Sequence, residues 1–404
     1  MSNWIKVRLG DIVELKRESY QPKPDEILPY IGLEHIGQGT LRLINVGKSN
    51  EVTSTKSYFS KGDILFGKLR PYFRKVVRPK FNGVCSTDIL VLTSKNPRKF
   101  SQTFLFYLMA SQEMIDLATA SSSGTKMPRA DWKVLQNLEV SIPEDFDEQE
   151  RIGKILEAID DKIDINTRMN ETLEEMAMTL YKHWFVDFGP FQDGEFVESE
   201  LGMIPKGWRV ISSYDLANYI NGKAFKTNQL VDNDGLPVIK IAELKSGITN
   251  STKFYNGNVE PKYLLQNGDI LFAWSASLGV FIWAKGEAVL NQHIFNVKPN
   301  GTLSKSMIYF TLKNIIQEFI EIAASRATTM GHITKQHLID KKIALPPDEL
   351  LVKVDEKMSN YYQMILSNML EVERLIQMRD YLLPRLLSGE IDLSQAEKQV
   401  EEVL

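Results

Sequence analysis

The chain carries one six-residue pattern twice. Residues 61–66 read Lys-Gly-Asp-Ile-Leu-Phe and residues 267–272 read Asn-Gly-Asp-Ile-Leu-Phe, a separation of 206 residues. Further matches recur in the same order at separations of 203 to 208 residues: Trp4 with Trp208, Leu28 with Leu236, Met127 with Met330, and Pro143 with Pro346. Loop insertions shift such a separation by a few residues while packed elements stay in step. The sequence therefore predicts one architecture built twice.

Length and composition allow two cores. With 404 residues, of which 43% are hydrophobic, the chain is long enough to bury two ordinary domains. No uncharged stretch approaches the roughly 18 apolar residues of a membrane span, and the first residues lack an apolar signal core, so we expect a cytoplasmic protein outside any membrane. The single cysteine, Cys85, permits neither an internal disulfide nor a cysteine zinc site. It is interpreted as core or loop filler rather than as a reactive thiol.

The formal net charge of −4 conceals an alternation of sign along the chain. Lysine and arginine exceed aspartate and glutamate by 6 over residues 1–145 and again by 6 over residues 201–346. Acidic residues are in excess by 10 over residues 146–200 and by 6 over residues 347–404. Two basic units with acidic spacers suit a polyanion that the units attract and the spacers repel, since phosphate attraction is long-ranged. Solvated acidic helices are the simpler alternative.

The acidic segments have the periodicity of long helices, with seam residues at 4-3-4-3 spacing over more than four heptads. The first seam consists of Ile152, Leu156, Ile159, Ile163, Asn166, Asn170, Leu173, Ala177, Leu180 and Trp184. The second, 202 residues further on, consists of Val354, Met358, Tyr361, Ile365, Asn368, Val372, Leu375, Arg379, Leu382 and Leu386. Proline and glycine bound the segments, with Pro384 and Gly389 expected to end the second helix. So narrow a seam predicts a coiled coil rather than a core helix.

The order of the segments predicts how these helices pair. The first connects the two basic units over some 33 residues, or about 50 Å at about 1.5 Å per residue. The second leaves the second unit and has to run back to meet the first, so we expect an antiparallel coiled coil with pseudo-two-fold symmetry. Asn166 and Asn368 occupy equivalent seam positions. We expect them to pair and to fix the helix register at some cost in stability.

The basic units are expected to mix helices and strands. Short β-branched and aromatic runs alternate with Gly, Asn and Pro, and one amphipathic helix follows near residues 102–119 and 305–324. The predicted fold class is α+β, with two similar mixed α/β domains separated by the two long helices. The expected divisions are a first domain at 1–145, a first spacer helix at 146–190, a second domain at 191–346, a second spacer helix at 347–390 and a tail at 391–404.

Signals for catalysis are weak. Residues 47–49, Gly-Lys-Ser, resemble the end of a phosphate-binding loop, but Arg42 stands where that loop requires glycine. A metal-dependent nuclease would use the residue types found at Asp232, Asp234, Glu243 and Lys245. The first half keeps no such set, which favours a charge pair at a strand edge. The five histidines show no metal-ligand spacing. We therefore expect a chain that is not itself an enzyme and that holds no metal or cofactor.

Three loops differ between the halves while their surroundings repeat. The loops pair as 68–75 with 273–279, 86–88 with 291–293, and 123–129 with 327–332. Interleaved cations and aromatics suit phosphate contact and base-edge reading, and Asn, Gln, Ser and Thr also pair with base edges. Ordinary surface-loop chemistry is the alternative for each loop alone. The predicted DNA-contacting residues are Lys68, Arg70, Arg74, Lys75, Thr87, Thr125, Lys126, Arg129, Trp274, Ser275, Ser277, Gln292, His293, Thr328, Thr329, His332 and Lys335.

Over nearly its whole length the chain resembles the specificity subunits of type I restriction-modification enzymes. The tryptophan that starts each unit, the repeated Gly-Asp-Ile-Leu-Phe, the Thr-x-Met loops and the helix ends at 180–188 and 382–391 carry the resemblance. It implies two target-recognition domains, each reading one half of a split, asymmetric site in double-stranded DNA. It also implies that the two helices are spacers that hold two modification subunits.

The resemblance assigns the chemistry to partners. Adenine methylation with S-adenosylmethionine belongs to the modification subunits, and ATP and Mg serve the motor and nuclease of restriction subunits. Apolar residues at the helix ends are the expected partner contacts, with local capping of the coiled coil as the alternative; they are Trp184, Phe185, Phe188, Leu386 and Leu387. The alternative function is a scaffold that binds proteins without reading DNA. A scaffold gives no reason for loops to diverge within a common frame.

Overall fold

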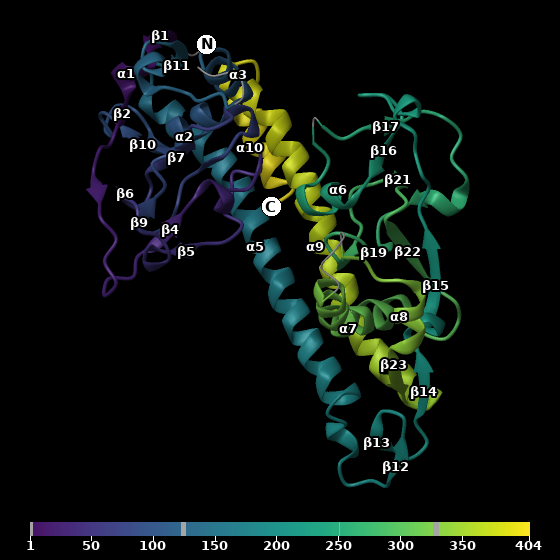
Figure 1. The fold of residues 1–404 in the computed structure, drawn as a ribbon. Coiled ribbons are helices and arrows are strands. Elements are labelled where there is room, and N and C mark those ends of the chain that lie inside the picture. Colours follow the sequence, from purple (N-terminus) through teal and green to yellow (C-terminus); the bar gives the residue numbers. More distant parts are fainter. Residues whose placement is uncertain (1–2, 123–126, 250, 326–330) are drawn as a thin grey trace. The chain divides into compact units, whose positions relative to one another are not determined.

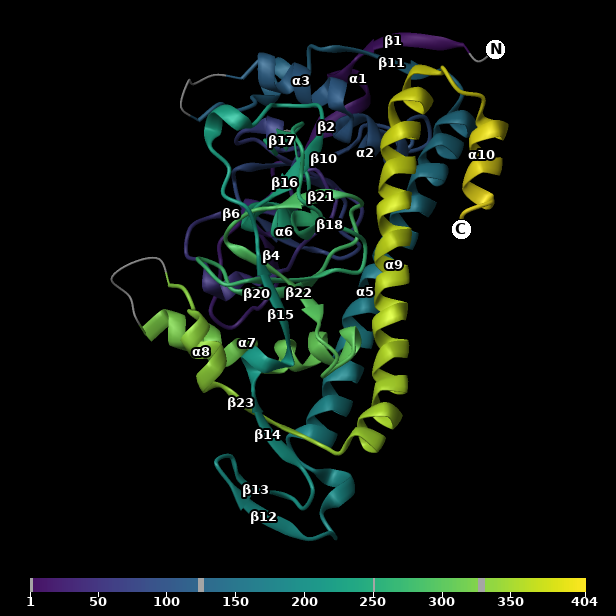
Figure 2. The same ribbon diagram turned by 90° about the vertical axis from the view of Figure 1, so that its right-hand side faces the viewer.

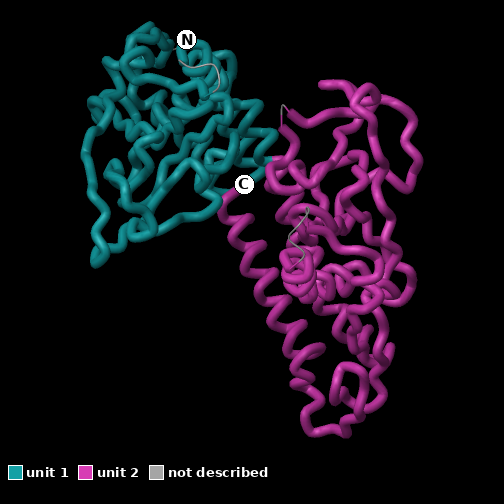
Figure 3. The backbone as a smooth tube through the Cα atoms, viewed as in Figure 1, with its two compact units in different colours: residues 1–162, 375–404 teal, residues 163–374 magenta. Residues whose placement is uncertain are grey.

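The computed structural model describes residues 3–122, 127–249, 251–325 and 331–404. It is an α+β protein, as the sequence predicts, and it divides into two compact units (Figures 1 and 3). Unit 1 comprises residues 1–162 and 375–404, and unit 2 comprises residues 163–374. Within the described ranges, none of the helices combines the length and the apolar character that a membrane crossing requires.

Unit 1 contains two sheets and a separate two-stranded ladder. Four antiparallel strands lie in the order β2-β10-β7-β8, and five lie in the order β3-β6-β9-β4-β5, in which β4 and β9 run parallel. The ladder pairs β1 with β11, and helices α2 and α3 follow β10. The bounds are β1 Trp4–Arg8, α1 Leu9–Ile12, β2 Val13–Leu15, β3 Ser19–Tyr20, β4 Pro29–Ile31, β5 Gly47–Lys48, β6 Lys56–Phe59, β7 Ile64–Gly67, β8 Val76–Val77, β9 Gly83–Cys85, β10 Ile89–Ser94, α2 Gln102–Ala110, α3 Gln112–Ala120, α4 Trp132–Leu135 and β11 Glu139–Pro143.

Unit 2 repeats this plan. Its four antiparallel strands lie in the order β15-β22-β19-β20, its β16 and β21 run parallel, and β14 pairs with β23. The single helix α7 takes the place of α2 and α3. The bounds are β12 Phe196–Ser199, β13 Gly202–Pro205, β14 Arg209–Ser212, β15 Ala217–Asn221, β16 Leu236–Ile239, α6 Ile241–Ser246, β17 Phe254–Tyr255, β18 Leu264–Leu265, β19 Ile270–Ala273, β20 Gly279–Ile282, β21 Ala288–Leu290, β22 Ile294–Pro299, α7 Lys305–Ser325, α8 Lys335–Asp340 and β23 Lys342–Leu345. The repeat predicted from sequence is confirmed in strand order.

The repeated hexamer is a turn that starts a buried strand. Gly62 and Gly268 have φ of 87° and 82°, a region that favours glycine. The following carboxylate closes the turn in both copies: Asp63 accepts from the Ser60 N–H at 2.7 Å, and Asp269 accepts from the Gln266 N–H at 3.1 Å. The next three side chains, Ile-Leu-Phe, are fully buried in each unit. The hexamer recurs because it builds the frame of each unit.

The two long helices form as the seams predict. Helix α5 spans Phe146–Phe185 and α9 spans Asp348–Ser388, and each contributes one part to each unit. They run antiparallel, since Asp160 on α5 bonds Arg379 on α9 in unit 1 while Asn170 bonds Asn368 in unit 2. The prediction that Pro384 ends the second helix is wrong: α9 continues through it, and Gly389, with φ of 70°, follows the last turn.

The expected pairing of Asn166 with Asn368 is also wrong. Asn368 Nδ2 donates to Asn170 Oδ1 at 2.9 Å, and Asn170 Nδ2 donates to the Ile365 carbonyl at 3.1 Å. Because the helices are antiparallel, four residues back along α5 corresponds to four residues forward along α9. Asn166 therefore lies opposite Val372, whose side chain has no hydrogen-bond acceptor. Asn166 is 2% exposed, and its Nδ2 has no hydrogen-bond partner among the described residues. The repeat therefore keeps the asparagine but not its partner.

A short final helix, α10 (Leu393–Glu401), lies against the helix pair in unit 1 (Figure 2). Glu397 on α10 accepts from Nε and Nη2 of Arg151 on α5, each at 2.9 Å. This hydrogen-bonded pairing holds the pKa of Glu397 below its usual value and raises that of Arg151. Residues 375–404, which include the segment predicted as a tail at 391–404, therefore belong to unit 1.

Candidate nucleic-acid interface

Three loops that are far apart in the sequence meet in unit 1. We call them loop A (residues 68–74), loop B (86–88) and loop C (127–130). Loop A connects β7 to β8, and its backbone groups form hydrogen bonds with loop B and loop C. The Lys68 N–H donates to the Asp88 carbonyl at 2.8 Å, the Arg70 N–H donates to the Pro128 carbonyl at 2.8 Å, and the Ala130 N–H donates to the Lys68 carbonyl at 3.0 Å. Together they form one surface beyond the end of β7.

The equivalent loops of unit 2 are joined by the same bonds. They are loop A′ (residues 274–278), loop B′ (291–293) and loop C′ (331–333). The Trp274 N–H donates to the His293 carbonyl at 3.4 Å, the Ala276 N–H donates to the Gly331 carbonyl at 3.0 Å, and the Ile333 N–H donates to the Trp274 carbonyl at 3.0 Å. Each bond repeats its unit 1 counterpart 203 to 206 residues later. The sequence comparison aligned these loops but gave no indication that they touch.

One backbone position in loop A is held in the same unfavourable conformation in both units. Arg70 has φ of 50°, and Ala276, 206 residues later, has φ of 58°. Non-glycine residues rarely adopt this left-handed region, which costs of order 1 kcal/mol or more. In both units the N–H of this residue is the one that donates to the third loop. The turn therefore persists although its side chain changes from a cation to a methyl group.

The side chains on the unit 1 loops are basic and aromatic. Arg70 is exposed, and its guanidinium carbon lies 5.9 Å from the ring centre of Phe73. Arg129 Nη2 contacts Asp88 Oδ1 at 2.9 Å, which orients an arginine that is still 54% exposed. Thr87 is exposed and Lys68 is half-buried. This surface combines long cationic donors with aromatic faces, the chemistry that phosphates and guanine edges attract.

The unit 2 loops carry neutral aromatic and amide side chains. Trp274 lies 5.5 Å, centre to centre, from the His293 ring, and its Nε1 donates to Asn221 Oδ1 at 3.1 Å. Gln292 Nε2 lies 3.2 Å from His293 Nε2. Beside these loops, Lys335 Nζ lies 4.3 Å from the ring centre of Tyr214. The remaining candidates are Ser275 and Ser277, which are half-buried, and His332, which is exposed.

Two predicted DNA contacts, Arg74 in loop A and Lys75 directly after it, are half-buried and bonded to carbonyl groups of the protein. Arg74 Nε donates to the Ala110 carbonyl at 2.7 Å, where α2 ends, and burial next to Arg379 lowers the pKa of Arg74. The Lys75 ammonium donates to the Leu33 carbonyl at 2.6 Å, and burial lowers its pKa as well. The sequence treated all four cations of this segment alike. The irregular backbone of this segment, and not a periodic pattern, decides which of them reach solvent.

Four further candidates, Thr125, Lys126, Thr328 and Thr329, lie outside the described residues. Other side chains on or beside the loops were missed. Tyr72 in loop A is 49% exposed, and Asp88 orients Arg129. Both lie in segments that the sequence singles out. Asn221, which holds the Trp274 indole from 53 residues away, carries no sequence signal that links it to the loop.

The expected partner contacts at the helix ends are not an exposed apolar cluster. Phe185 is 6% exposed and stacks on Tyr181 with ring centres 4.8 Å apart. Leu386 is 1% exposed, while Trp184, Phe188 and Leu387 are half-buried. At the end of α5 the start of the second repeat covers these side chains, since Trp208 contacts the Phe185 and Phe188 rings. The assignment of these five residues to a partner interface stays a prediction.

Two of the three acidic residues considered for metal-dependent cleavage, Asp232 and Glu243, have structural partners. Glu243 accepts from the Lys240 N–H at 3.0 Å and from the Thr252 hydroxyl at 3.2 Å, and Asp232 is paired with Lys253. Among the described residues, no three His, Cys, Asp or Glu side chains are grouped so as to hold a metal ion.

Comparison with known proteins agrees with the duplicated fold. A family model described as the type I restriction modification DNA specificity domain matches residues 1–175 and 205–372. The type I restriction enzyme HindI specificity subunit of Haemophilus influenzae is 26% identical over 464 residues, which cover 97% of this chain and 100% of that protein. The MjaIX specificity subunit of Methanocaldococcus jannaschii is 27% identical over 309 residues, covering 72% of this chain and 69% of that protein. The crystal structure of the type I restriction-modification S subunit from M. genitalium shares the fold, with a TM-score of 0.51 and 17% identity over 95% of this chain and 96% of that one.

Proposed function

Because the chain belongs to the family of type I restriction-modification DNA specificity proteins, we propose that it selects the DNA sequence on which a type I restriction-modification complex acts. Each unit reads one half of a split site through its three joined loops. The chain itself carries out no chemistry. It determines where the partner subunits act.

One observation carries this proposal: the hydrogen bonds that join the three loops recur in the two units, and the side chains on those loops do not. Three equivalent hydrogen bonds and one equivalent left-handed residue fix the loops. On this frame Lys68 is replaced by Trp274, Arg70 by Ala276, and Asp88 by His293. A frame that keeps its geometry while its exposed groups change is suited to reading different sequences with one docking mode. A protein-binding scaffold would not require this difference.

The side chains suggest what each unit reads. In unit 1, Arg70 and Arg129 supply the planar, forked donors that pair with the two acceptors of a guanine edge or with phosphate. In unit 2, Gln292 and His293 supply amide and imidazole groups, and Trp274 supplies an apolar face. These groups pair with the edges of adenine and thymine better than with the guanine edge, which presents two acceptors side by side. The two half-sites are therefore expected to be unrelated in sequence.

Partner subunits complete the activity. We propose that two modification subunits, which use S-adenosylmethionine to methylate adenine, assemble on the helix pair of α5 and α9. Restriction subunits with ATP-dependent motor and nuclease activity then join that complex. The support for this step is family membership together with the two long helices, whose acidic surfaces are unsuited to DNA.

Sequencing of methylated adenines in a host with and without the gene tests the proposal. The expected result is a gene-dependent motif with two specified halves separated by unspecified bases. Replacing residues 1–145 with those of a related chain should change one half and leave the other unchanged. A continuous or palindromic motif, or no motif, would contradict the proposal. A protein-binding scaffold would give no motif but would still co-purify with its partners.

A further inference from the structure

Arg379 is a buried cation on the seam of α9. It is 2% exposed, and the equivalent seam position on α5, 202 residues earlier, is Ala177. Such positions ordinarily hold apolar residues. Replacing a buried ionic group by an apolar side chain of similar volume is often neutral or stabilising. Helix packing alone therefore gives no reason for a guanidinium at this position.

The guanidinium joins the helix pair to the body of unit 1. Its Nη1 donates to Asp160 Oδ1 on α5 at 3.0 Å and to the Thr40 carbonyl at 3.4 Å. Its Nε and Nη2 donate to Asp380 Oδ1 at 3.1 and 3.0 Å. The Tyr107 hydroxyl on α2 donates to the other oxygen of Asp160 at 2.8 Å. One side chain thus connects α5, α9 and a turn that lies 339 residues away in the sequence.

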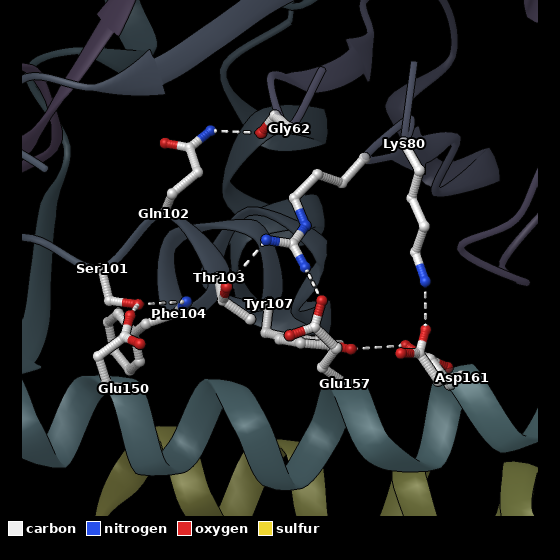
Figure 4. A network of polar contacts seen from close by, with 12 residues as sticks. Gly62, Lys80, Ser101, Gln102, Thr103, Phe104, Tyr107, Glu150, Glu157 and Asp161 are labelled. Atoms are coloured by element: carbon white, nitrogen blue, oxygen red, sulfur yellow. Dashed lines mark hydrogen bonds and ion pairs between the residues drawn. The ribbon is translucent and has the colours of Figure 1, made fainter.

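Neighbouring contacts hold this part of α5 in place (Figure 4). Arg78 contacts Glu157 and also donates to the Thr103 hydroxyl at 2.8 Å. One turn further along the helix, Lys80 donates to Asp161 at 2.6 Å. Asp160 therefore lies on a stretch of helix that is fixed to the body on both sides. The position of Arg379 follows from that of Asp160.

Thr40 belongs to a turn, residues 37–42, that contacts loop A. The Gly37 N–H donates to the Arg42 carbonyl at 2.9 Å and closes the turn, and the Gly39 N–H donates to the Phe73 carbonyl at 3.2 Å. Leu41 within the turn has φ of 58°, which a leucine adopts only when its surroundings hold it there. Arg379 therefore supports the turn, and the turn supports the segment of loop A that follows Arg70.

We propose that Arg379 is a positioning residue for the DNA-reading surface of unit 1, which it controls through the turn at 37–42. This inference rests on the proposed function. Unit 2 has no such connection from the equivalent seam position, since Ala177 carries no donor. Reading of the first half-site thus depends on Arg379, a residue of α9. Base preference in that half-site therefore depends on how α9 packs against α5.

The test uses the full chain and a library of duplexes with randomised sequence, selected by binding and then sequenced. The variants are Arg379→Met, which fills the seam without a donor, and Arg379→Lys, which keeps the charge but ends one bond short of the guanidinium nitrogen that donates to both Asp160 and Thr40. For both, the expected result is at least a tenfold loss of base preference in the half-site assigned to unit 1, with the other half within twofold of wild type. Amide exchange over residues 37–42 and 68–74 should accelerate, and exchange over α2 should not. If Arg379→Met does not fold, Arg379→Lys decides.

The matched control is Lys285→Met, which removes an ion pair between the body of unit 2 and Glu373 on α9. It should leave the unit 1 half-site unchanged. If both Arg379 variants fold and keep both base preferences, the inference is overturned while the proposed function stands. Equal loss in both halves by a folded Arg379→Lys chain also overturns it. A wild-type chain that enriches no motif would instead overturn the proposed function, and the exchange measurement would still report whether Arg379 supports the turn.

Discussion

The side-chain amide of Asn368 donates to the side-chain oxygen of Asn170 at 2.9 Å across the seam of α5 and α9. Asn166, which matches Asn368 in the repeat, has no such partner for its Nδ2 within the part of the chain that the structure describes. Two asparagines that are equivalent in the sequence therefore differ in energy. One belongs to a satisfied polar pair, and the other keeps a buried donor without an acceptor.

This difference predicts opposite effects of the same substitution. Asn166→Leu should raise the free energy of unfolding by about 1 to 3 kcal/mol, because it removes a buried unsatisfied donor and adds apolar contact. Asn368→Leu should lower it by a similar amount, because Asn170 Oδ1 then loses its donor. Urea melts of the full chain measure both. Equal effects of the two substitutions would show that the seam does not distinguish these positions.

The loop A arginines predict a separation of DNA binding from stability. Arg70→Ala should leave the melting temperature near wild type and either reduce the salt dependence of DNA binding by about one unit of slope or relax one base by about 1 to 3 kcal/mol. Arg74→Ala should instead lower the melting temperature, since the guanidinium holds the Ala110 carbonyl. Binding titrations at several salt concentrations and thermal melts distinguish the two. An unstable Arg70→Ala chain with unchanged DNA binding would reverse the assignment.

The two copies of the hexamer turn predict unequal costs for removing their aspartates. Asp269→Ala removes the acceptor of the Asn296 Nδ2, which donates to Asp269 at 3.0 Å. The Asn296 side chain is 0% exposed, and its Oδ1 already lacks a hydrogen-bond partner among the residues that the structure describes. Asp63→Ala removes the ion-pair partner of Lys16, but the Lys16 side chain is 32% exposed and can be hydrated instead. Both should destabilise, by about 1 to 3 kcal/mol, with Asp269→Ala the more costly. Amide exchange in β7 and β19 reports each unit separately. The opposite order would mean that the Lys16 ion pair matters more than burial.

The thiol of Cys85 should report on the folding of unit 1, and its contribution to stability should depend on pH. Burial of this 0% exposed thiol raises its pKa to about 12. At pH values below about 8.5, the thiol pKa in the unfolded chain, the thiol is protonated in both the folded and the unfolded chain, and its contribution to the free energy of unfolding is fully present. That contribution is lost as the pH rises from about 8.5 toward 12, because the unfolded chain then loses the proton first. At pH 8 alkylation by iodoacetamide should be negligible in the folded chain and complete after unfolding in urea. Since Cys85 is the only cysteine, mass spectrometry gives the labelled fraction directly. Rapid labelling of the folded chain would show that β9 opens or that the thiol is accessible.

The sequence alone determined the duplication, the α+β class, the long helices and the segments that form the loops. These follow from local signals: a spaced repeat, a 4-3-4-3 periodicity, and turns marked by Gly and Asp. Periodicity assigns a face to every residue of a regular helix, which is why the seam residues are largely buried as expected. It assigns none in an irregular loop, so Arg70 and Arg74 were indistinguishable until the backbone placed one outward and the other on Ala110.

The tertiary structure decided which distant segments meet. Equivalent positions in the two helices face equivalent positions, but the residues there differ: Asn368 faces Asn170, whereas Asn166 faces Val372, which stands 202 residues after Asn170. The register of the antiparallel helices, which the seam pattern alone does not specify, decides that Asn166 and Asn368 do not face each other. The bond between Arg379 and Thr40 joins residues 339 apart, through a chain that leaves unit 1 along α5 and returns along α9. Contacts of that kind depend on three-dimensional closure of the chain, which side-chain pattern along a single strand or helix does not encode.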